Sequence, residues 1–172
     1  MRHADSHPRR IVWFYTIAAA VVALDQLTKL AARQYLSFDQ PRTVIPGFFD
    51  LKLSYNSGAA FGIMPNWAPL FIIAGLVAVF AIVRLRRAGA SSPALSVGLG
   101  LLLGGAIGNL IDRLASPSGE VTDFLSLHLT LGDRIYAWPT FNVADIAIVC
   151  GIAAVFFYVY VIEKRRAERR ED

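Results

Sequence analysis

Residues 67–83, WAPLFIIAGLVAVFAIV, decide the fold, because this stretch contains no charged residue. An α-helix needs about 17 to 25 mostly apolar residues to cross the hydrocarbon core of a membrane, and this stretch is long enough. Three further segments are comparably long and mostly apolar, at residues 11–32, 94–111 and 141–162. We therefore predict an all-α membrane protein, a four-helix transmembrane bundle in a single domain over residues 1–172.

The composition agrees with a membrane location. Hydrophobic residues make up 55% of the 172-residue chain and charged residues 17%, whereas soluble domains have about 45–50% and about 25%. The net charge of +4 does not indicate a nucleic-acid partner, since the basic residues flank apolar segments. The single cysteine, Cys150, cannot form an internal disulfide, and we expect it to be a small packing residue.

The basic residues predict how the four segments cross the membrane, since Lys and Arg accumulate on the cytoplasmic side. Three basic clusters alternate with two loops that lack them: Arg2, Arg9 and Arg10; Arg84, Arg86 and Arg87; and Lys164, Arg165, Arg166, Arg169 and Arg170. This pattern places both termini in the cytoplasm. A basic start before an apolar run also resembles a signal peptide. However, the helical pattern continues through residues 25–30, which favours a retained helix.

The two loops on the outer side, residues 33–66 and 112–140, contain strand signals. From Phe49 to Tyr55, apolar and polar residues alternate, as in a half-buried strand, and Pro46-Gly47 just before it indicates a turn. Residues 124–131 are a second, weaker strand candidate. We expect a small β element, a cradle, resting on the outer membrane surface.

Polar residues of three helices are expected at one depth. With a rise of 1.5 Å per residue, Asp25 and Lys29 lie roughly 21 and 27 Å above the inner end of their helix. Asn109 and Asp112 lie at roughly 22 and 27 Å, and the fourth helix brings Asn142 and Asp145 within about 8 Å of its outer end. Ionisable residues inside a membrane span are expensive and mark a functional site.

Local spacing supports this site. Asp25 and Lys29 can pair one helical turn apart, either as structural support or in direct chemistry. On the third helix, Arg113 shares a face with Asn109 and Asp112; it either orients a carbonyl or lipid ester, or snorkels to the interface. A stripe of small residues at helical spacing predicts close helix packing beside them: Gly100, Gly104 and Gly108.

Two further aspartates are candidates for catalysis. Asp123 lies in an expected loop at the mouth of the bundle, and Asp145 lies in the fourth helix. Two neighbouring carboxylates cannot both ionise cheaply, so one can act as general acid and the other as general base. A zinc protease is excluded by the missing His-Glu-x-x-His pair. A serine nucleophile at Ser57 with His128 as base lacks the Gly-x-Ser-x-Gly elbow.

Five short motifs with polar residues follow one another along the chain. They are Asp25-Gln26-Leu27-Thr28-Lys29, Tyr55-Asn56-Ser57-Gly58-Ala59-Ala60-Phe61, Gly105-Ala106-Ile107-Gly108-Asn109-Leu110-Ile111-Asp112-Arg113, Val121-Thr122-Asp123-Phe124 and Phe141-Asn142-Val143-Ala144-Asp145. Each motif alone is weak, but the series is specific: it resembles the bacterial lipoprotein signal peptidases, or signal peptidase II, a family of aspartic endopeptidases. Thr122, where the family usually has an apolar residue, is a minor departure that we expect to change no role.

The resemblance implies that Asp123 and Asp145 are the catalytic dyad. It implies that the other polar motif residues bind substrate or support the dyad: Asn56, Gly58, Asn109, Asp112, Arg113, Asn142, Asp25 and Lys29. The implied reaction removes signal peptides from prolipoproteins, N-terminal to a diacylglyceryl-modified cysteine, without a metal or other cofactor. We expect a monomer in the bacterial inner membrane, in contact with lipid, with its site facing outward.

Two other classes of protein are less consistent with the sequence. A proton-coupled transporter would need polar groups through the full depth of the membrane, but residues 12–23 and 151–162 contain few: Tyr15, Thr16, Tyr158 and Tyr160. A non-enzymatic scaffold would explain the glycine stripe but not the polar cluster.

Overall fold

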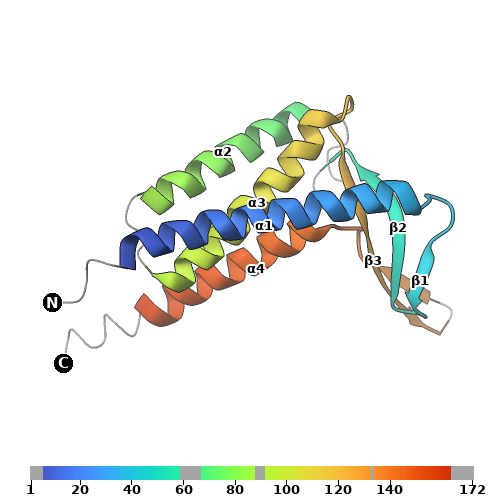
Figure 1. Cartoon of the computed structure of the whole chain (residues 1–172). Helices are drawn as coiled ribbons and strands as arrows, with labels where there is room; N and C mark the ends of the chain where they lie inside the picture. The colour runs from blue at the N-terminus through green and yellow to red at the C-terminus, as the bar shows by residue number, and fades with distance from the viewer. Residues whose placement is uncertain (1–5, 59–66, 88–91, 133, 164–172) are drawn as a thin grey trace.

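The computed structural model describes residues 6–58, 67–87, 92–132 and 134–163. Four long helices run side by side in this part of the chain (Figure 1). They are α1 Ser6–Tyr35, α2 Ala68–Arg87, α3 Pro93–Ala115 and α4 Val143–Phe157, which continues into the π-helical segment η2 Tyr158–Glu163. Each is long and apolar enough to cross a membrane. The predicted four-helix bundle is confirmed, and α1 begins at the end of the bundle where α4 ends.

Two helix ends differ from the prediction in ways that affect the site. Helix α3 continues to Ala115, beyond the predicted residue 111, so that Asp112 and Arg113 lie within the helix. Helix α4 begins at Val143 because Asn142 caps it: the Asn142 side chain accepts from the Asp145 N–H, and the Asp145 side chain accepts from the Asn142 N–H. This reciprocal capping satisfies backbone donors that a helix start leaves free.

Helix α3 packs closely between α1 and α4, because glycines line both of its faces. A Cβ atom at Gly104 would lie 2.6 Å from the Val21 Cβ of α1, and one at Gly100 would lie 2.9 Å from a carbonyl of the same helix. On the other face, a Cβ at Gly105 would lie 2.5 Å from the Ala144 carbonyl of α4. The predicted packing role of the stripe is confirmed.

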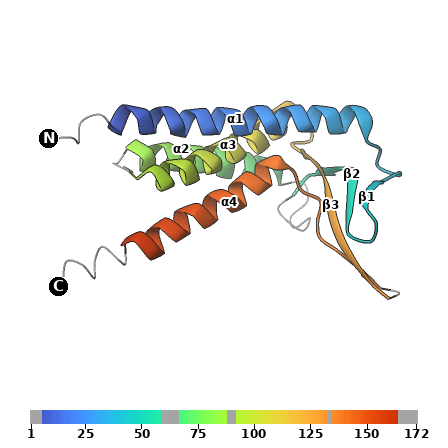
Figure 2. The same ribbon diagram turned by 60° about the horizontal axis from the view of Figure 1, so that its bottom comes forward.

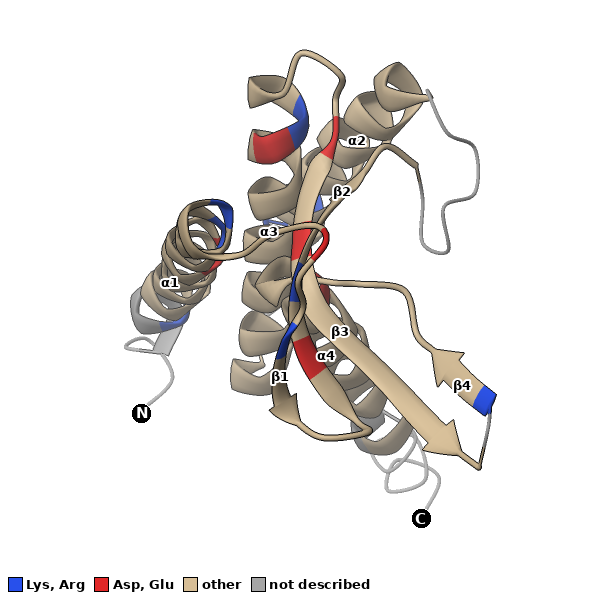
Figure 3. Ribbon diagram, turned by 90° about the vertical axis from the view of Figure 1, so that its right-hand side faces the viewer, with Lys and Arg blue, Asp and Glu red and all other residues tan. Residues whose placement is uncertain are grey.

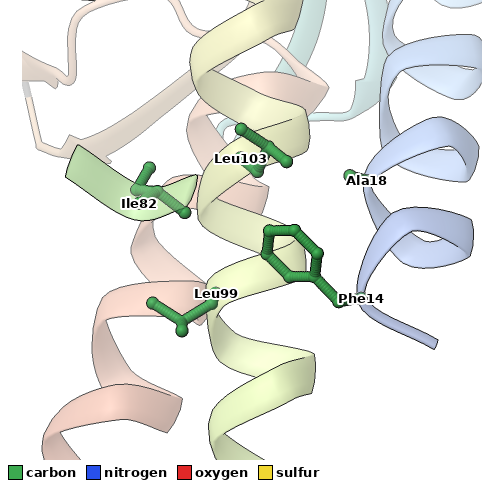
Figure 4. Packing of buried hydrophobic residues seen from close by; sticks show 5 residues of the cluster. All are labelled: Phe14, Ala18, Ile82, Leu99 and Leu103. Carbon is green, nitrogen blue, oxygen red and sulfur yellow. The ribbon is translucent and has the colours of Figure 1, made fainter. Parts of the chain in front are cut away.

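An apolar cluster joins α1, α2 and α3 toward the end of the bundle away from the strands. Figure 4 shows its five buried side chains, which are Phe14, Ala18, Ile82, Leu99 and Leu103. Cys150 does not belong to such a cluster. It is exposed on α4, so the expectation that it is a small packing residue is wrong.

A four-stranded antiparallel sheet covers the other end of the bundle (Figure 2). Its strands follow chain order: β1 Arg42–Ile45, β2 Phe49–Asn56, β3 Val121–Leu131 and β4 Arg134–Ala137. Strand β2 matches the prediction. Strand β3 begins at Val121, before the predicted residue 124, so Asp123 lies in a strand and not in the expected loop. The short, exposed strands β1 and β4 were not predicted.

A second apolar cluster attaches the sheet to the bundle. Ala32 at the end of α1 packs with Leu53 of β2 and Phe124 of β3, and all three side chains are buried. In the pairing of the two central strands, Ser54 lies opposite Asp123. The cluster therefore fixes this part of β3 against the helix ends, where the polar residues gather.

Candidate active site

Asp123 and Asp145 both line a cavity of about 550 Å³ at the junction of bundle and sheet. Strand β3 supplies Asp123, whose residue is only 1% exposed. The first turn of α4 supplies Asp145, which is partly buried. Figure 3, which looks onto the sheet, shows acidic and basic residues where the ends of α1 and α3 approach β3. The two predicted carboxylates therefore meet at one site.

Asn142 connects the two carboxylates. Its side-chain Nδ2 donates to Asp123 Oδ1 at 2.7 Å, and its backbone N–H donates to Asp145 Oδ2 at 3.1 Å. The Asn142 residue is fully buried, and as the N-cap of α4 it has a fixed backbone. One residue thus sets the relative position of both candidate acids.

Two further amide side chains complete the contacts of the pair. Asn56 at the end of β2 donates from Nδ2 to Asp123 Oδ2 at 3.3 Å. Asn109 of α3 donates from Nδ2 to Asp145 Oδ1 at 2.8 Å. Each carboxylate oxygen of the pair therefore accepts a hydrogen bond from an N–H group, which restricts its rotation.

Lys29 lies behind the asparagine side chains that contact the two carboxylates. Among the described hydrogen bonds, it does not donate directly to Asp123 or Asp145. Its fully buried ammonium group contacts Asp25 at 2.8 Å and Asp112 at 3.4 Å. It also donates to Asn109 Oδ1 at 2.9 Å. The predicted pairing with Asp25 and the shared depth are confirmed. The geometry favours support over direct chemistry, because Lys29 bonds to Asn109, which in turn donates to Asp145.

Asp25 ties α1 to the start of α4. Its Oδ1 accepts from the Ala144 N–H at 3.0 Å, one of the backbone donors that a helix start leaves without an intrahelical partner. The Gly108 side of α3 passes close by, since a Cβ there would lie 2.6 Å from Asp25 Oδ2. Asp25 therefore joins α1 to both α3 and α4 at the level of the site.

Arg113 orients backbone carbonyls, which is one of the two roles considered from the sequence. Its guanidinium donates to the Gly119 carbonyl at 2.9 Å and to the Gly58 carbonyl at 2.8 Å. It also lies over the Phe71 ring, 4.9 Å from the centroid. The Gly58 N–H in turn donates to Asn56 Oδ1 at 3.0 Å. Arg113 thereby fixes the segment that carries Asn56; residues 59–61 of that motif lie outside the described residues.

The environment of Asp123 favours its protonated form. Burial, and then the nearby charge of Asp145, raise its pKa to about 7, against the opposing effect of the Asn142 and Asn56 hydrogen bonds and of Lys29. A carboxyl group with this pKa can donate or accept a proton near neutral pH. Together with a second carboxylate on the same cavity, it supports general acid–base chemistry.

Three polar residues of the site were not singled out from the sequence. Gln26 donates to Asp25 and Asp112 at 3.0 and 3.2 Å. Arg33 and Thr122 donate to Asp112 and also contact each other. Gln26 and Arg33 lie three and four residues from Lys29, which places all three on one face of α1. This spacing could have indicated that Gln26 and Arg33 belong to the site.

Other chemistries have less support in the structure. Among the described residues, no group of three His, Cys, Asp or Glu side chains is arranged to bind a metal ion. His128 lies on β3 with its Nδ1 3.5 Å from an Asp50 oxygen. Its partner is therefore a carboxylate of β2 and not the hydroxyl of Ser57.

Comparisons with known proteins agree with this arrangement. A family model described as signal peptidase (SPase) II matches residues 17–161. The chain is 46% identical over 153 residues to a lipoprotein signal peptidase of Oleidesulfovibrio alaskensis, covering 85% of this chain and 93% of that protein. It is 38% identical over 150 residues to one of Symbiobacterium thermophilum, covering 87% and 95%.

Solved structures show the same fold. Two bacterial membrane enzymes, determined by the in meso method at 2.3 and 1.9 Å resolution, align with TM-scores of 0.75 and 0.74. Their sequences are 31% and 30% identical to this one. The first alignment covers 85% of this chain and 86% of the other, and the second covers 86% and 92%.

Proposed function

The chain belongs to the signal peptidase II family, and on that premise we propose that Asp123 and Asp145 are its catalytic residues. The protein is a multi-pass membrane protease that removes signal peptides from prolipoproteins. The observation that carries the assignment of the dyad is the double contact of Asn142, which donates to one oxygen of each carboxylate.

The surroundings of the two carboxylates suggest different roles. Asp145 lies in the first turn of α4 and accepts hydrogen bonds from a backbone N–H and from Asn109. The partial positive charge of the helix N-terminus stabilises its ionised form. Asp145 is therefore the general base, and Asp123, with a pKa raised to about 7, is the general acid.

The reaction follows from these roles. Asp145 takes a proton from a water molecule, and the water oxygen attacks the carbonyl carbon of the scissile amide. Asp123 donates its proton to the carbonyl oxygen as the tetrahedral intermediate forms. Collapse of the intermediate breaks the C–N bond, with a proton passing from the dyad to the leaving amine.

The substrate class follows from where the site lies. The cavity that contains the dyad continues along the apolar α4 residues Ile146, Ile148 and Val149. A substrate cysteine carrying diacylglycerol would be anchored in lipid at this depth, with the bond on its N-terminal side within reach of the dyad. We infer that the lipid positions the bond for attack, since misplaced reactants lose orders of magnitude in rate.

The orientation in the membrane follows from charge. The outer loops carry the sheet and the site, whereas the basic cluster at Arg84, Arg86 and Arg87 ends α2 at the opposite end of the bundle. Because such clusters stay in the cytoplasm, the site faces outward from the bacterial inner membrane and both termini are cytoplasmic.

The decisive experiment replaces each aspartate by its amide. Asp123→Asn and Asp145→Asn preserve shape but remove the exchangeable acid or base. Purified variants in detergent should leave a diacylglyceryl-modified prolipoprotein uncut, whereas Asp39→Asn, outside the cavity, should cleave it normally. An unmodified precursor should be cut much more slowly by the wild-type enzyme. Normal processing by either dyad variant would refute the assignment.

A further inference from the structure

Thr122, the residue before Asp123, is bound at each of its polar atoms by a different helix. Its hydroxyl accepts from Arg33 Nε of α1 at 2.9 Å. Its N–H donates to Asp112 Oδ2 of α3 at 2.9 Å. Its carbonyl accepts from the Asn142 side chain, the cap of α4, at 3.4 Å. With 2% of its surface exposed, Thr122 is a junction between β3 and three helices.

Arg33 makes a bridge at this junction. Besides its bond to the Thr122 hydroxyl, it donates from Nη2 to Asp112 Oδ1 at 3.0 Å. Asp112 is buried, whereas the Arg33 side chain is 38% exposed. The guanidinium therefore closes the outer side of a triangle in which Thr122 and Asp112 also bond each other. Two planar N–H groups held by two partners allow little movement.

We propose that Arg33 and Thr122 are positioning residues for the general acid: they fix the backbone on the N-terminal side of Asp123. The inference rests on the proposed role of Asp123. On the C-terminal side, Phe124 is already fixed, since it is buried in the apolar cluster and its N–H donates to the Phe141 carbonyl. The bridge between Arg33, Thr122 and Asp112 restrains the N-terminal side of Asp123 in the same way. It gives Thr122 a role that the sequence analysis did not suggest.

The bridge acts on the chemical step and not on substrate binding. Val121 and Asp123 line the cavity, and neither Thr122 nor Arg33 is among its lining residues. This follows from the strand, in which neighbouring side chains point to opposite faces. Loss of the bridge would let the Asp123 carboxyl drift from the position in which it can protonate the carbonyl oxygen. The turnover number should then fall while KM stays constant.

The test removes each side of the bridge from the full-length enzyme in detergent, with a diacylglyceryl-modified peptide as substrate. Thr122→Val and Arg33→Met should each lower kcat about threefold to tenfold, the change that the loss of one hydrogen bond corresponds to. KM should stay within about twofold. Thr130→Val on the exposed end of β3 and Arg42→Met on β1 are matched controls that should behave as wild type.

Two further variants separate positioning from general loss of structure. Thr122→Ser retains the hydroxyl and should restore kcat, which a purely apolar packing role of Thr122 would not predict. The double variant Arg33→Met/Thr122→Val should be no slower than the worse single variant, because the bond between Arg33 and Thr122 is already lost in each single variant. Should Thr122→Val lower the melting temperature, the half-exposed Arg33→Met variant still provides the kcat measurement.

The outcomes discriminate clearly. Wild-type kcat in both single variants, a rise in KM alone, or additive effects in the double variant would each overturn the inference. Asp123→Asn, measured alongside, reports on the proposed function: if it stays inactive while the bridge variants are normal, only the inference fails. If it cleaves normally, the role of Asp123 itself is wrong.

Discussion

Replacing Lys29 by methionine should severely destabilise the protein. Methionine has nearly the same length and shape but carries no charge, so the change leaves packing in place. Lys29 is fully buried and contacts Asp25 at 2.8 Å and Asp112 at 3.4 Å. Both carboxylates are buried as well. Without the ammonium group, Asp25 loses its only described cation and Asp112 keeps only Arg33.

The magnitude follows from the cost of a buried charge without its partner. Removing one member of a buried ion pair costs about 3–5 kcal/mol. For a protein of this size, about 1 kcal/mol shifts the melting temperature by 2–4 °C, so Lys29→Met should lower it by about 6–20 °C. Adding Asp25→Asn should recover part of this loss, since it removes the charge that Lys29 balanced most closely.

Thermal unfolding of the purified variants in one detergent measures this effect. Lys52→Met, an exposed lysine on β2, is the matched control and should melt with the wild type. If Lys29→Met melts within about 2 °C of wild type, the loss of the ammonium group leaves no costly unpaired carboxylate, and the reasoning fails. It also fails if Asp25→Asn/Lys29→Met is less stable than Lys29→Met, because a pairing role requires the second change to relieve the first.

Three other outcomes follow from the structure. The general acid must be protonated to act, and burial raises the Asp123 pKa to about 7. When kcat is measured from about pH 5 to about pH 9, it should therefore fall as the pH rises through about 7. A kcat that does not change over this range would contradict the role of Asp123. Gly108→Ala, whose Cβ would lie 2.6 Å from Asp25 Oδ2, should cost about 1–3 kcal/mol in thermal unfolding, and wild-type melting would contradict the close packing. A reporter fused after Arg87 should be cytoplasmic and one inserted near Gly119 extracytoplasmic; the reverse would contradict the orientation.

The four helices could be predicted because a membrane span requires a long apolar run, which is a local property of the sequence. Strand β2 was predicted for a related reason, since alternation from Phe49 to Tyr55 is also local. Strands β1 and β4 are short and exposed on every residue, so burial imposes no pattern on them. Their existence depends on pairing with distant segments, which the sequence does not display.

The sequence predicted the level along the helices at which the polar residues lie, but not which of their side chains contact one another. Counting residues along the helices brought Asp25, Asn109 and Asp145 to one level, and the hydrogen bonds confirm it. Spacing alone favoured Asp145 over Asp123 as a functional residue. Asp145 lies inside an apolar helix, whereas the sequence pattern placed Asp123 in an ordinary polar loop. The pairing of β3 with β2, a non-local event, places Asp123 on the cavity that Asp145 also lines. The resemblance to a family supplied what periodicity could not.

Charge balance gives a physical reason why one proton belongs on the dyad. Around the site, three cations face the carboxylates: Lys29, Arg33 and Arg113. Four carboxylates gather there: Asp25, Asp112, Asp123 and Asp145. With one of the pair protonated, positive and negative charges are equal in number; with both ionised, an excess negative charge would remain in a poorly hydrated environment. The supporting ion pairs therefore stabilise the singly protonated form of the proposed dyad, although none of these cations donates a described hydrogen bond to Asp123 or Asp145.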